Sequence, residues 1–150
     1  MNDRYLYRAK RKDNGEWISG YLYGIWERKY ILWGMINDVP DMKEVDPSTI
    51  CQCTGLKDKN VNLIWENDIV EIVSSPKRSY KYLIWWNREM SLMDAIPLDG
   101  LDFNGHDYWN GNYSYFRYET FCAMMQDPWG DFSDIKVIGN IFDNPELMNE

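Results

Sequence analysis

The three cysteines and the single histidine of this 150-residue chain are the side chains best able to bind a metal. Cys51 and Cys53 are one residue apart, so on a strand they would point to the same face, about 7 Å apart. That spacing suits two ligands of one ion and is poor for a disulfide. With Cys122 and His106 they would complete a Cys3His zinc site. Structural zinc sites normally carry paired C-x2-C knuckles, and there is no second pair, so we interpret the cysteines as small core residues.

A second group of candidates lies between residues 97 and 134. His106 precedes Asp107, and a neighbouring carboxylate can make an imidazole a general acid or base, but no partner nucleophile is identifiable. Carboxylate oxygens are also the ligands that Mg²⁺ and Ca²⁺ prefer. The aspartates of this region are Asp99, Asp102, Asp107, Asp127, Asp131 and Asp134. Their spacing matches no calcium loop and favours a solvated acidic face. We expect no catalytic residue, no metal and no cofactor.

Charge and tryptophan point instead to a binding surface. Residues 1–90 carry 14 Lys/Arg against 13 Asp/Glu, whereas residues 91–150 carry 2 against 11. The acidic part would repel a phosphate backbone, which excludes broad nucleic-acid binding by the whole surface. Exposed tryptophan is typical of interface hot spots. We expect a protein partner to bind a surface made by Trp109, Trp129, Asp99, Asp102 and Asp107.

Three other interpretations of this region stay open. The acidic residues can simply keep the domain soluble, and loop tryptophans can fold back as a lid on the core. The acidic surface could also mimic DNA and occupy a DNA-binding enzyme.

The N-terminal segment is basic and offers an alternative function. Its cationic residues, with a tryptophan on the following strand, could form a phosphate-plus-stacking site for single-stranded nucleic acid. These residues are Arg8, Lys10, Arg11, Lys12 and Trp17, with Tyr21 beside them. The same pattern describes an edge strand that charge protects from pairing, and we favour this edge-strand interpretation.

The elements that must position these residues are predicted to be strands. Aromatic residues make up 16% of the chain, and large aromatics favour half-buried sheet surfaces. Residues 4–10 and 17–23 alternate with period two around the turn residues Asp13-Asn14-Gly15, which predicts a hairpin. Residues 37–48 contain two prolines and several acids, which predicts a loop.

The remaining pattern continues in the same way. We predict strands at 30–35, 50–54, 63–73, 80–86 and 135–142, a turn at 55–60 that joins two of them, and a long loop at 97–112. A long or bent strand, or a hairpin, is expected at 113–125, a turn at 127–130, and a short helical turn at Asn144-Pro145-Glu146. No apolar run approaches the 18 residues of a membrane span, and the polar N-terminus lacks an export signal, so we expect the cytoplasm.

Three stretches resemble the YopX-type family, which is encoded mainly by bacteriophages and prophages. They are RAKRKDNGEWISGYL, EVDPSTICQCTGLKDKNVNLIWENDIVEIV and IKVIGNIFDNPELM. The resemblance implies an all-β fold, with an irregular N-terminal sheet region at about 1–60 and a C-terminal SH3-like barrel at about 61–150. ENDIV would open this barrel and IKVIGNIF would close it. The family's activity is not established, so the resemblance implies no reaction.

The sequence departs from the family pattern at two turns. Val61 stands where the family usually has the Gly of an Asn-Gly turn, and Asn67 where it usually has Gly. Asparagine tolerates a left-handed backbone, so we expect Asn67 to keep the family geometry. A β-branched residue does not, so we expect a different turn near Val61.

These observations predict a phage or prophage accessory protein in the cytoplasm of a bacterial host. We expect a non-enzymatic module that binds a host or phage protein. The alternative is a nucleic-acid-binding protein that uses the basic hairpin.

Overall fold

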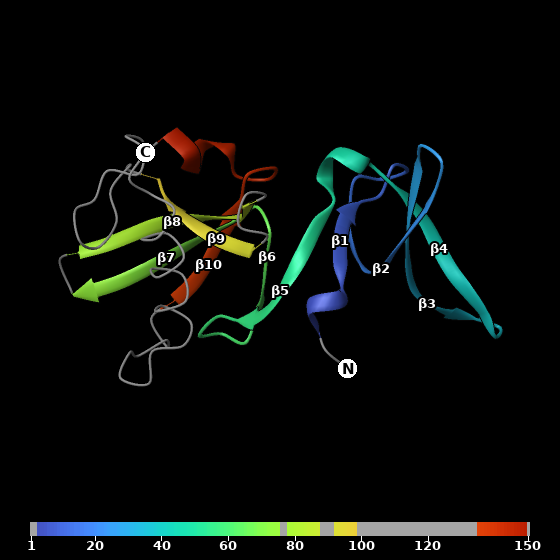
Figure 1. Cartoon of the computed structure of the whole chain (residues 1–150), viewed down its shortest axis with the longest axis horizontal. Coiled ribbons are helices and arrows are strands. Elements are labelled where there is room, and N and C mark those ends of the chain that lie inside the picture. The colour runs from blue at the N-terminus through green and yellow to red at the C-terminus, as the bar shows by residue number, and fades with distance from the viewer. Residues whose placement is uncertain (1–2, 76–77, 88–91, 99–134, 150) are drawn as a thin grey trace. The chain divides into compact units, whose positions relative to one another are not determined.

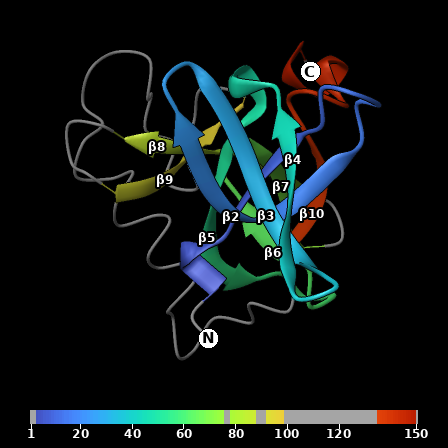
Figure 2. The same ribbon diagram turned by 90° about the vertical axis from the view of Figure 1, so that its right-hand side faces the viewer.

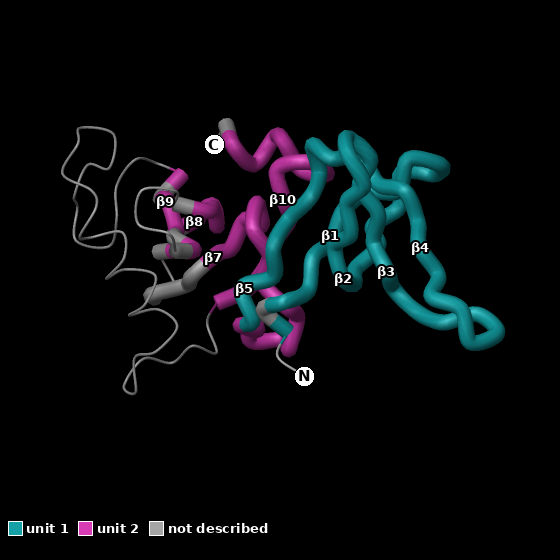
Figure 3. The backbone as a smooth tube through the Cα atoms, turned by 45° about the vertical axis from the view of Figure 1, so that its right-hand side comes forward, with its two compact units in different colours: residues 1–55 teal, residues 56–150 magenta. Residues whose placement is uncertain are grey.

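The computed structural model describes residues 3–75, 78–87, 92–98 and 135–149. They form strands and short 3₁₀ turns, in antiparallel sheets, which confirms the all-β class. The chain divides into two compact units, residues 1–55 and 56–150 (Figure 3). From the sequence we expected lobes at about 1–60 and 61–150. Within the described ranges, no helix has the length and apolar character needed to cross a membrane.

The first unit is a curled antiparallel sheet (Figure 1). Its strands are β1 (Tyr7–Lys10), β2 (Trp17–Ile25), β3 (Arg28–Ile36), β4 (Val39–Val45) and β5 (Cys51–Lys57), preceded by the 3₁₀ turn η1 (Asp3–Tyr5) and with η2 (Pro47–Thr49) before β5. The order is β4-β3-β2-β1-β5, and β6 (Leu63–Trp65) follows β5 as the sixth strand of this sheet. The last two residues of β5 belong to the second unit.

The predicted N-terminal hairpin is confirmed. β1 and β2 pair in a register that places Lys10 opposite Trp17, and Gly15 in the turn has a φ of 73°. Ile18 and Gly20 are buried, while Ser19 and Tyr21 on the other face are exposed. The period-two pattern of this segment therefore predicted the hairpin, and the structure shows which of its faces is buried.

The prediction that β1 is an edge strand is wrong. β5 pairs with β1 on the side away from β2, with Arg8 opposite Cys51. The chain just after β1 also meets the end of β4: Arg11 bridges to Val45, and the Lys12 amide donates to the Glu44 carbonyl at 3.0 Å. Local alternation could not show either contact, because the partners lie more than thirty positions away along the chain.

Residues 37–48 are not a loop, as predicted, but mostly a strand. Asn37 and Asp38 have φ values of 51° and 65°, as both central residues of a type I′ hairpin turn require. β4 follows directly and contains Pro40. It ends the strand order, and proline is tolerated in an edge strand because it removes no hydrogen bond from a ladder.

The core of the first unit lies on the inner face of the curled sheet. Ala9, Ile18, Ile31 and Val45 are buried there, and Tyr7 and Ile50 pack against them. The four buried residues come one each from β1, β2, β3 and β4, so this small cluster joins these strands.

The second unit contains a four-stranded antiparallel sheet in the order β10-β7-β8-β9. The strands are β7 (Asp68–Ser75), β8 (Arg78–Asn87), β9 (Leu92–Pro97) and β10 (Ile135–Asn140), with β6 (Leu63–Trp65) before them and η5 (Pro145–Asn149) after. β9 was not predicted, whereas the C-terminal turn was. β7 begins at the Asp of the ENDIV segment, β10 is the IKVIGN segment, and the two strands pair directly. In the described residues the end strands of this sheet, β10 and β9, do not pair with each other, so the sheet is not closed. The SH3-like barrel therefore stays a prediction.

The predicted strand at 63–73 is two strands joined by a tight turn. Glu66 and Asn67 form the turn between β6 and β7, and Asn67 has a φ of 71°, which confirms its left-handed geometry. Val61 has a φ of 65°, so the prediction that this position avoids the left-handed region is wrong. Hydrogen bonds around the neighbouring Asp58 hold that turn, as described below.

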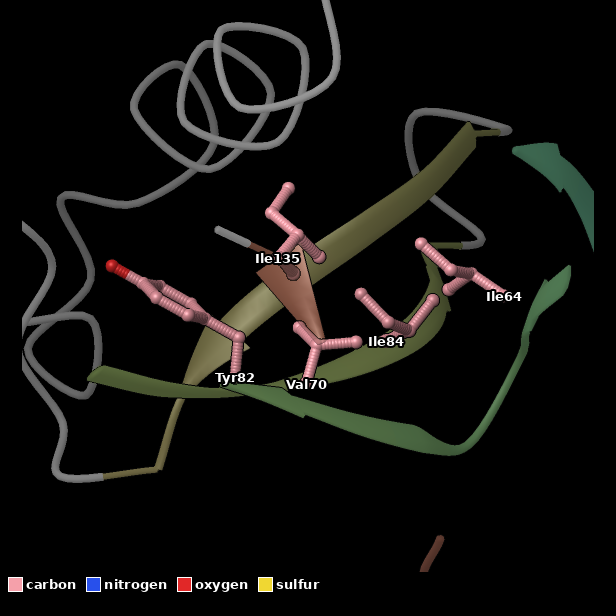
Figure 4. Packing of buried hydrophobic residues seen from close by; sticks show 6 residues of the cluster. Ile64, Val70, Tyr82, Ile84 and Ile135 are labelled. Atoms are coloured by element: carbon pink, nitrogen blue, oxygen red, sulfur yellow. The ribbon is translucent and has the colours of Figure 1, made fainter. Parts of the chain in front are cut away.

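The core of the second unit lies on one side of its sheet. Val70, Tyr82 and Ile84 point to the same side, where Ile64 and Ile135 meet them (Figure 4). Buried Ala95 completes the cluster. The predicted long loop beyond Leu98, the strand or hairpin at 113–125 and the turn at 127–130 lie outside the described residues.

Candidate binding surface

The acidic, tryptophan-bearing surface predicted from the sequence lies outside the described residues. This applies to Trp109, Trp129, Asp99, Asp102 and Asp107, and also to Cys122 and His106. The other two residues of the considered zinc set are described. Cys51 and Cys53 are buried in β5, where the Cys51 thiol contacts the Thr49 carbonyl at 3.2 Å. The described ranges hold no group of three or more His, Cys, Asp or Glu that could bind a metal ion.

Three residues of the predicted nucleic-acid site come together. The Arg8 guanidinium lies 4.6 Å from the centre of a Trp17 ring, and the Lys10 ammonium lies 5.3 Å from it. The register explains this contact, because Lys10 is opposite Trp17 and Arg8 is opposite the next residue on that face, Ser19. We call Arg8, Lys10 and Trp17 the basic corner.

Arg11 and Lys12 are engaged elsewhere. The Arg11 guanidinium binds both carboxylate oxygens of Asp13, at 2.9 and 2.5 Å, and this hydrogen bond raises the pKa of Arg11. The Lys12 ammonium lies 3.3 Å from a Glu44 carboxylate oxygen. Both pairs are solvent-exposed and contribute little to stability, but they partly neutralise two of the four predicted phosphate contacts.

The outer face of the first unit, opposite its core, is rich in aromatic and apolar side chains. Tyr21 lies opposite Leu32, and Leu32 lies opposite Met42, so these three share a face across β2, β3 and β4. Tyr23 lies opposite Tyr30, with ring centres 6.4 Å apart. The alternation of residues in β2 predicted the part of this face that lies on β2. The part on β4 was missed, because Pro40 and the acids of β4 suggested a loop.

The turn between β2 and β3 carries the most exposed aromatic side chain in the described residues. Trp26 is 93% exposed and has a φ of 52°, a conformation that costs a non-glycine residue about 1–2 kcal/mol. Ile25 beside it is exposed, and Arg28, closing the turn, has its pKa raised by a hydrogen bond to Tyr30. We call residues 25–28 the tip. No local pattern distinguished Trp26 from the other tryptophans, because its exposure depends on where the turn falls.

β3 runs between the tip and a second hairpin end, formed with β4 at its opposite end (Figure 2). At this second end Trp33, Met35, Ile36 and Val39 are all more than half exposed. The described surface of the first unit thus has two apolar ends, with the outer face between them.

Asp58, a buried carboxylate of the second unit, has several structural partners. The Asp58 carboxylate accepts backbone hydrogen bonds from Asn60, Asn62 and Val137, each at 2.9 Å. Burial would raise the pKa of Asp58, but these bonds outweigh burial and lower it. Asp58 thereby fixes the 58–62 turn to β10.

The comparison with known protein families agrees with the architecture. The family model described as YopX protein matches residues 6–149, nearly the whole chain. No curated protein matches the sequence. From the extent of the family match, together with the all-β fold, the chain belongs to the YopX protein family.

Proposed function

We propose that this YopX protein is a non-enzymatic binding module that engages a host or phage protein. It would act as a phage or prophage accessory protein in the cytoplasm of the bacterial host. The contact begins at the tip and continues along the adjoining part of the outer face.

The observation that carries this proposal is Trp26. A tryptophan exposed to 93% gives up burial, and its left-handed backbone adds strain, so neither property serves the fold of the unbound protein. Exposed tryptophans at rigid positions are typical interface hot spots. Strain at an exposed residue of this kind is typical of functional sites.

The surroundings of Trp26 support a protein ligand. Ile25 and Tyr23 are 42% and 41% exposed beside it, and Glu27 and Arg28, which complete the tip, carry opposite charges. An apolar centre with a polar rim is the usual anatomy of a protein–protein interface.

Affinity capture from phage-infected host cells tests the proposal. Trp26→Gly and, separately, Tyr23→Ser are expected to lower recovery of the bound protein at least about tenfold, since hot-spot truncations weaken binding by 2 kcal/mol or more. Met148→Ser, at an exposed apolar residue of η5, is the matched control and should leave recovery unchanged. Full recovery with both tip variants would exclude this surface.

The acidic surface predicted from the sequence is a second contact for the same partner. Its test is the Trp109→Ala, Trp129→Ala double variant in the same capture. Recovery at the wild-type level would remove this surface from the proposal.

A specific observation favours one alternative, the binding of single-stranded nucleic acid. In the basic corner, Arg8 and Lys10 lie over the Trp17 ring. A guanidinium on an aromatic ring offers a cationic plane on which a base can stack, with phosphate nearby.

Fluorescence polarisation with labelled single strands at low salt tests this alternative, and the chain supplies a matched control. Arg8→Gln with Lys10→Gln removes two cations of the basic corner. Arg11→Gln with Lys12→Gln removes the same charge from residues already paired to Asp13 and Glu44. If the corner binds nucleic acid, the first variant loses affinity at least about tenfold more than the second, with a shallower salt dependence. Equal losses, or no binding by the wild-type protein, exclude it.

A further inference from the structure

The outward side of β2 carries an inference that rests on the nucleic-acid alternative above and extends it beyond the basic corner. The residues of β2 that point away from the core alternate along the strand, and they are Trp17, Ser19, Tyr21, Tyr23 and Ile25. Trp17 belongs to the basic corner, whereas Tyr21 and Tyr23 lie further along the same strand and are exposed. We call Trp17, Tyr21 and Tyr23 the aromatic line.

The spacing of the aromatic line suits the bases of an extended single strand. Residues on one face of a strand repeat about every 7 Å, so Tyr21 lies about 7 Å from Tyr23 and roughly 13 Å from Trp17 along β2. Nucleic-acid-binding sheets stack two or three unpaired bases on aromatic side chains of one face. Tyr30 widens this platform, because it lies opposite Tyr23 with ring centres 6.4 Å apart.

The charges around the aromatic line favour an anionic ligand. Among the outward residues of β1 and β2, and those of β3 that pair with β2, three are cations and none is a carboxylate. The cations are Arg8, Lys10 and Arg28. Glu44, which lies opposite Tyr30 on β4, is already paired with Lys12. This composition contrasts with the whole chain, where 24 Asp/Glu outnumber 16 Lys/Arg.

The net charge of −8 affects the strength of such binding more than its place. Charges further apart than about 8 Å are largely screened at physiological salt, so the cations closest to a bound phosphate dominate its interaction. Arg8 and Lys10 lie 4.6 and 5.3 Å from the centre of the Trp17 ring, where a stacked base would bring its phosphate. We therefore expect weak binding that declines steeply with added salt.

We infer that a single strand of nucleic acid lies along β2, with bases stacked on the three rings of the aromatic line. Arg8 and Lys10 contact its phosphates beside Trp17. Because every base has a π-face, the rings select the single-stranded form rather than a particular sequence.

Fluorescence polarisation of the full chain at low salt tests the inference, with labelled oligothymidylate and oligouridylate strands of about 12 nucleotides. Both strands should bind, because base stacking and phosphate contacts do not require the 2′-hydroxyl. Tyr21→Ser with Tyr23→Ser removes two rings and should weaken binding at least about tenfold. Tyr21→Phe with Tyr23→Phe keeps the rings and should retain the affinity.

Two control variants separate the aromatic line from its neighbours. Met42→Ser changes an exposed residue of the same face on β4 and should leave the affinity unchanged. Trp26→Gly should also leave it unchanged, although it is expected to reduce capture of a protein partner. Loss of strand binding in either control would place the nucleic acid elsewhere and overturn the inference.

Crosslinking and competition supply readouts on the wild-type protein. Ultraviolet irradiation with an iodouracil-substituted strand should attach the strand within residues 17–23 or at Tyr30, as peptide mass spectrometry would show. Polyglutamate at equal charge concentration should displace the strand far less than unlabelled oligothymidylate does, because it offers no bases to stack. Equal displacement would assign this face to an acidic protein segment instead.

The outcomes distinguish this inference from the function on which it rests. If the wild-type protein binds neither strand, the nucleic-acid alternative and the aromatic line both fail. If Arg8→Gln with Lys10→Gln abolishes binding while Tyr21→Ser with Tyr23→Ser does not change it, the basic corner stands and the aromatic line is overturned. Crosslinks confined to other residues would overturn it as well.

Discussion

At the scale of single residues, two opposing effects act on the pKa of the Asp58 carboxyl group. Removal from water disfavours its charge, while three backbone N–H groups stabilise the charge, and the hydrogen bonds prevail. We expect Asp58→Asn to lower the free energy of unfolding by about 1–3 kcal/mol, because an amide accepts fewer of these bonds. Denaturant unfolding at pH 7 measures this, with the exposed Glu146→Gln as control. Equal loss in both variants would contradict it.

The lowered pKa of Asp58 also predicts a pH dependence. Its folded-state pKa lies below its unfolded value, so its stabilisation is complete above the unfolded value of about 3.9 and declines as pH falls through the folded-state pKa. Wild-type protein should therefore lose stability more steeply than Asp58→Asn below about pH 4. Parallel stability curves for the two proteins in acid would refute this assignment.

Val61 illustrates strain without an evident binding role. It has a φ of 65° in the turn that Asp58 anchors, and its N–H donates to the Asp58 carbonyl at 3.0 Å. Val61→Gly should raise the free energy of unfolding by about 1 kcal/mol, since glycine adopts this conformation without a Cβ clash. Thermal unfolding followed by circular dichroism would detect a higher midpoint. An unchanged or lower midpoint would show that the valine is not strained there.

At the scale of elements, sequence patterns predicted strands whose neighbours lie close along the chain. Turn residues and alternation sufficed for the β1–β2 hairpin and for β8. They failed for β4, where Pro40 is acceptable only because of the strand's edge position. They also failed for the surroundings of β1, because Cys51 and Val45 reach it from distant segments.

The same division applies to the candidate sites. The basic corner follows from the register of one hairpin, so Arg8, Lys10 and Trp17 were predicted together. The pairing of Lys12 with Glu44 was not, because it joins residues 32 positions apart. The exposure of Trp26 and of the hairpin end between β3 and β4 depends on where strands stop pairing, which composition does not encode.

The turn between β3 and β4 yields a prediction of its own. Asp38 has a φ of 65° at the second central position of a type I′ turn, where glycine is preferred. Asp38→Gly should raise the free energy of unfolding by about 0.5–1 kcal/mol. Thermal unfolding of this variant measures the change. A lower midpoint would indicate that the aspartate side chain itself is needed.

At the scale of the whole molecule, the position of β1 between β2 and β5 affects how the protein folds as it is synthesised. β2 leaves the ribosome soon after β1, but Cys51 and Gln52, which cover the other side of β1, follow some forty residues later. At elongation rates of about 5–20 residues per second, that interval lasts seconds. During it, the nascent N-terminal hairpin exposes a free strand edge, where the charges of Arg8 and Lys10 would discourage premature pairing with neighbouring chains.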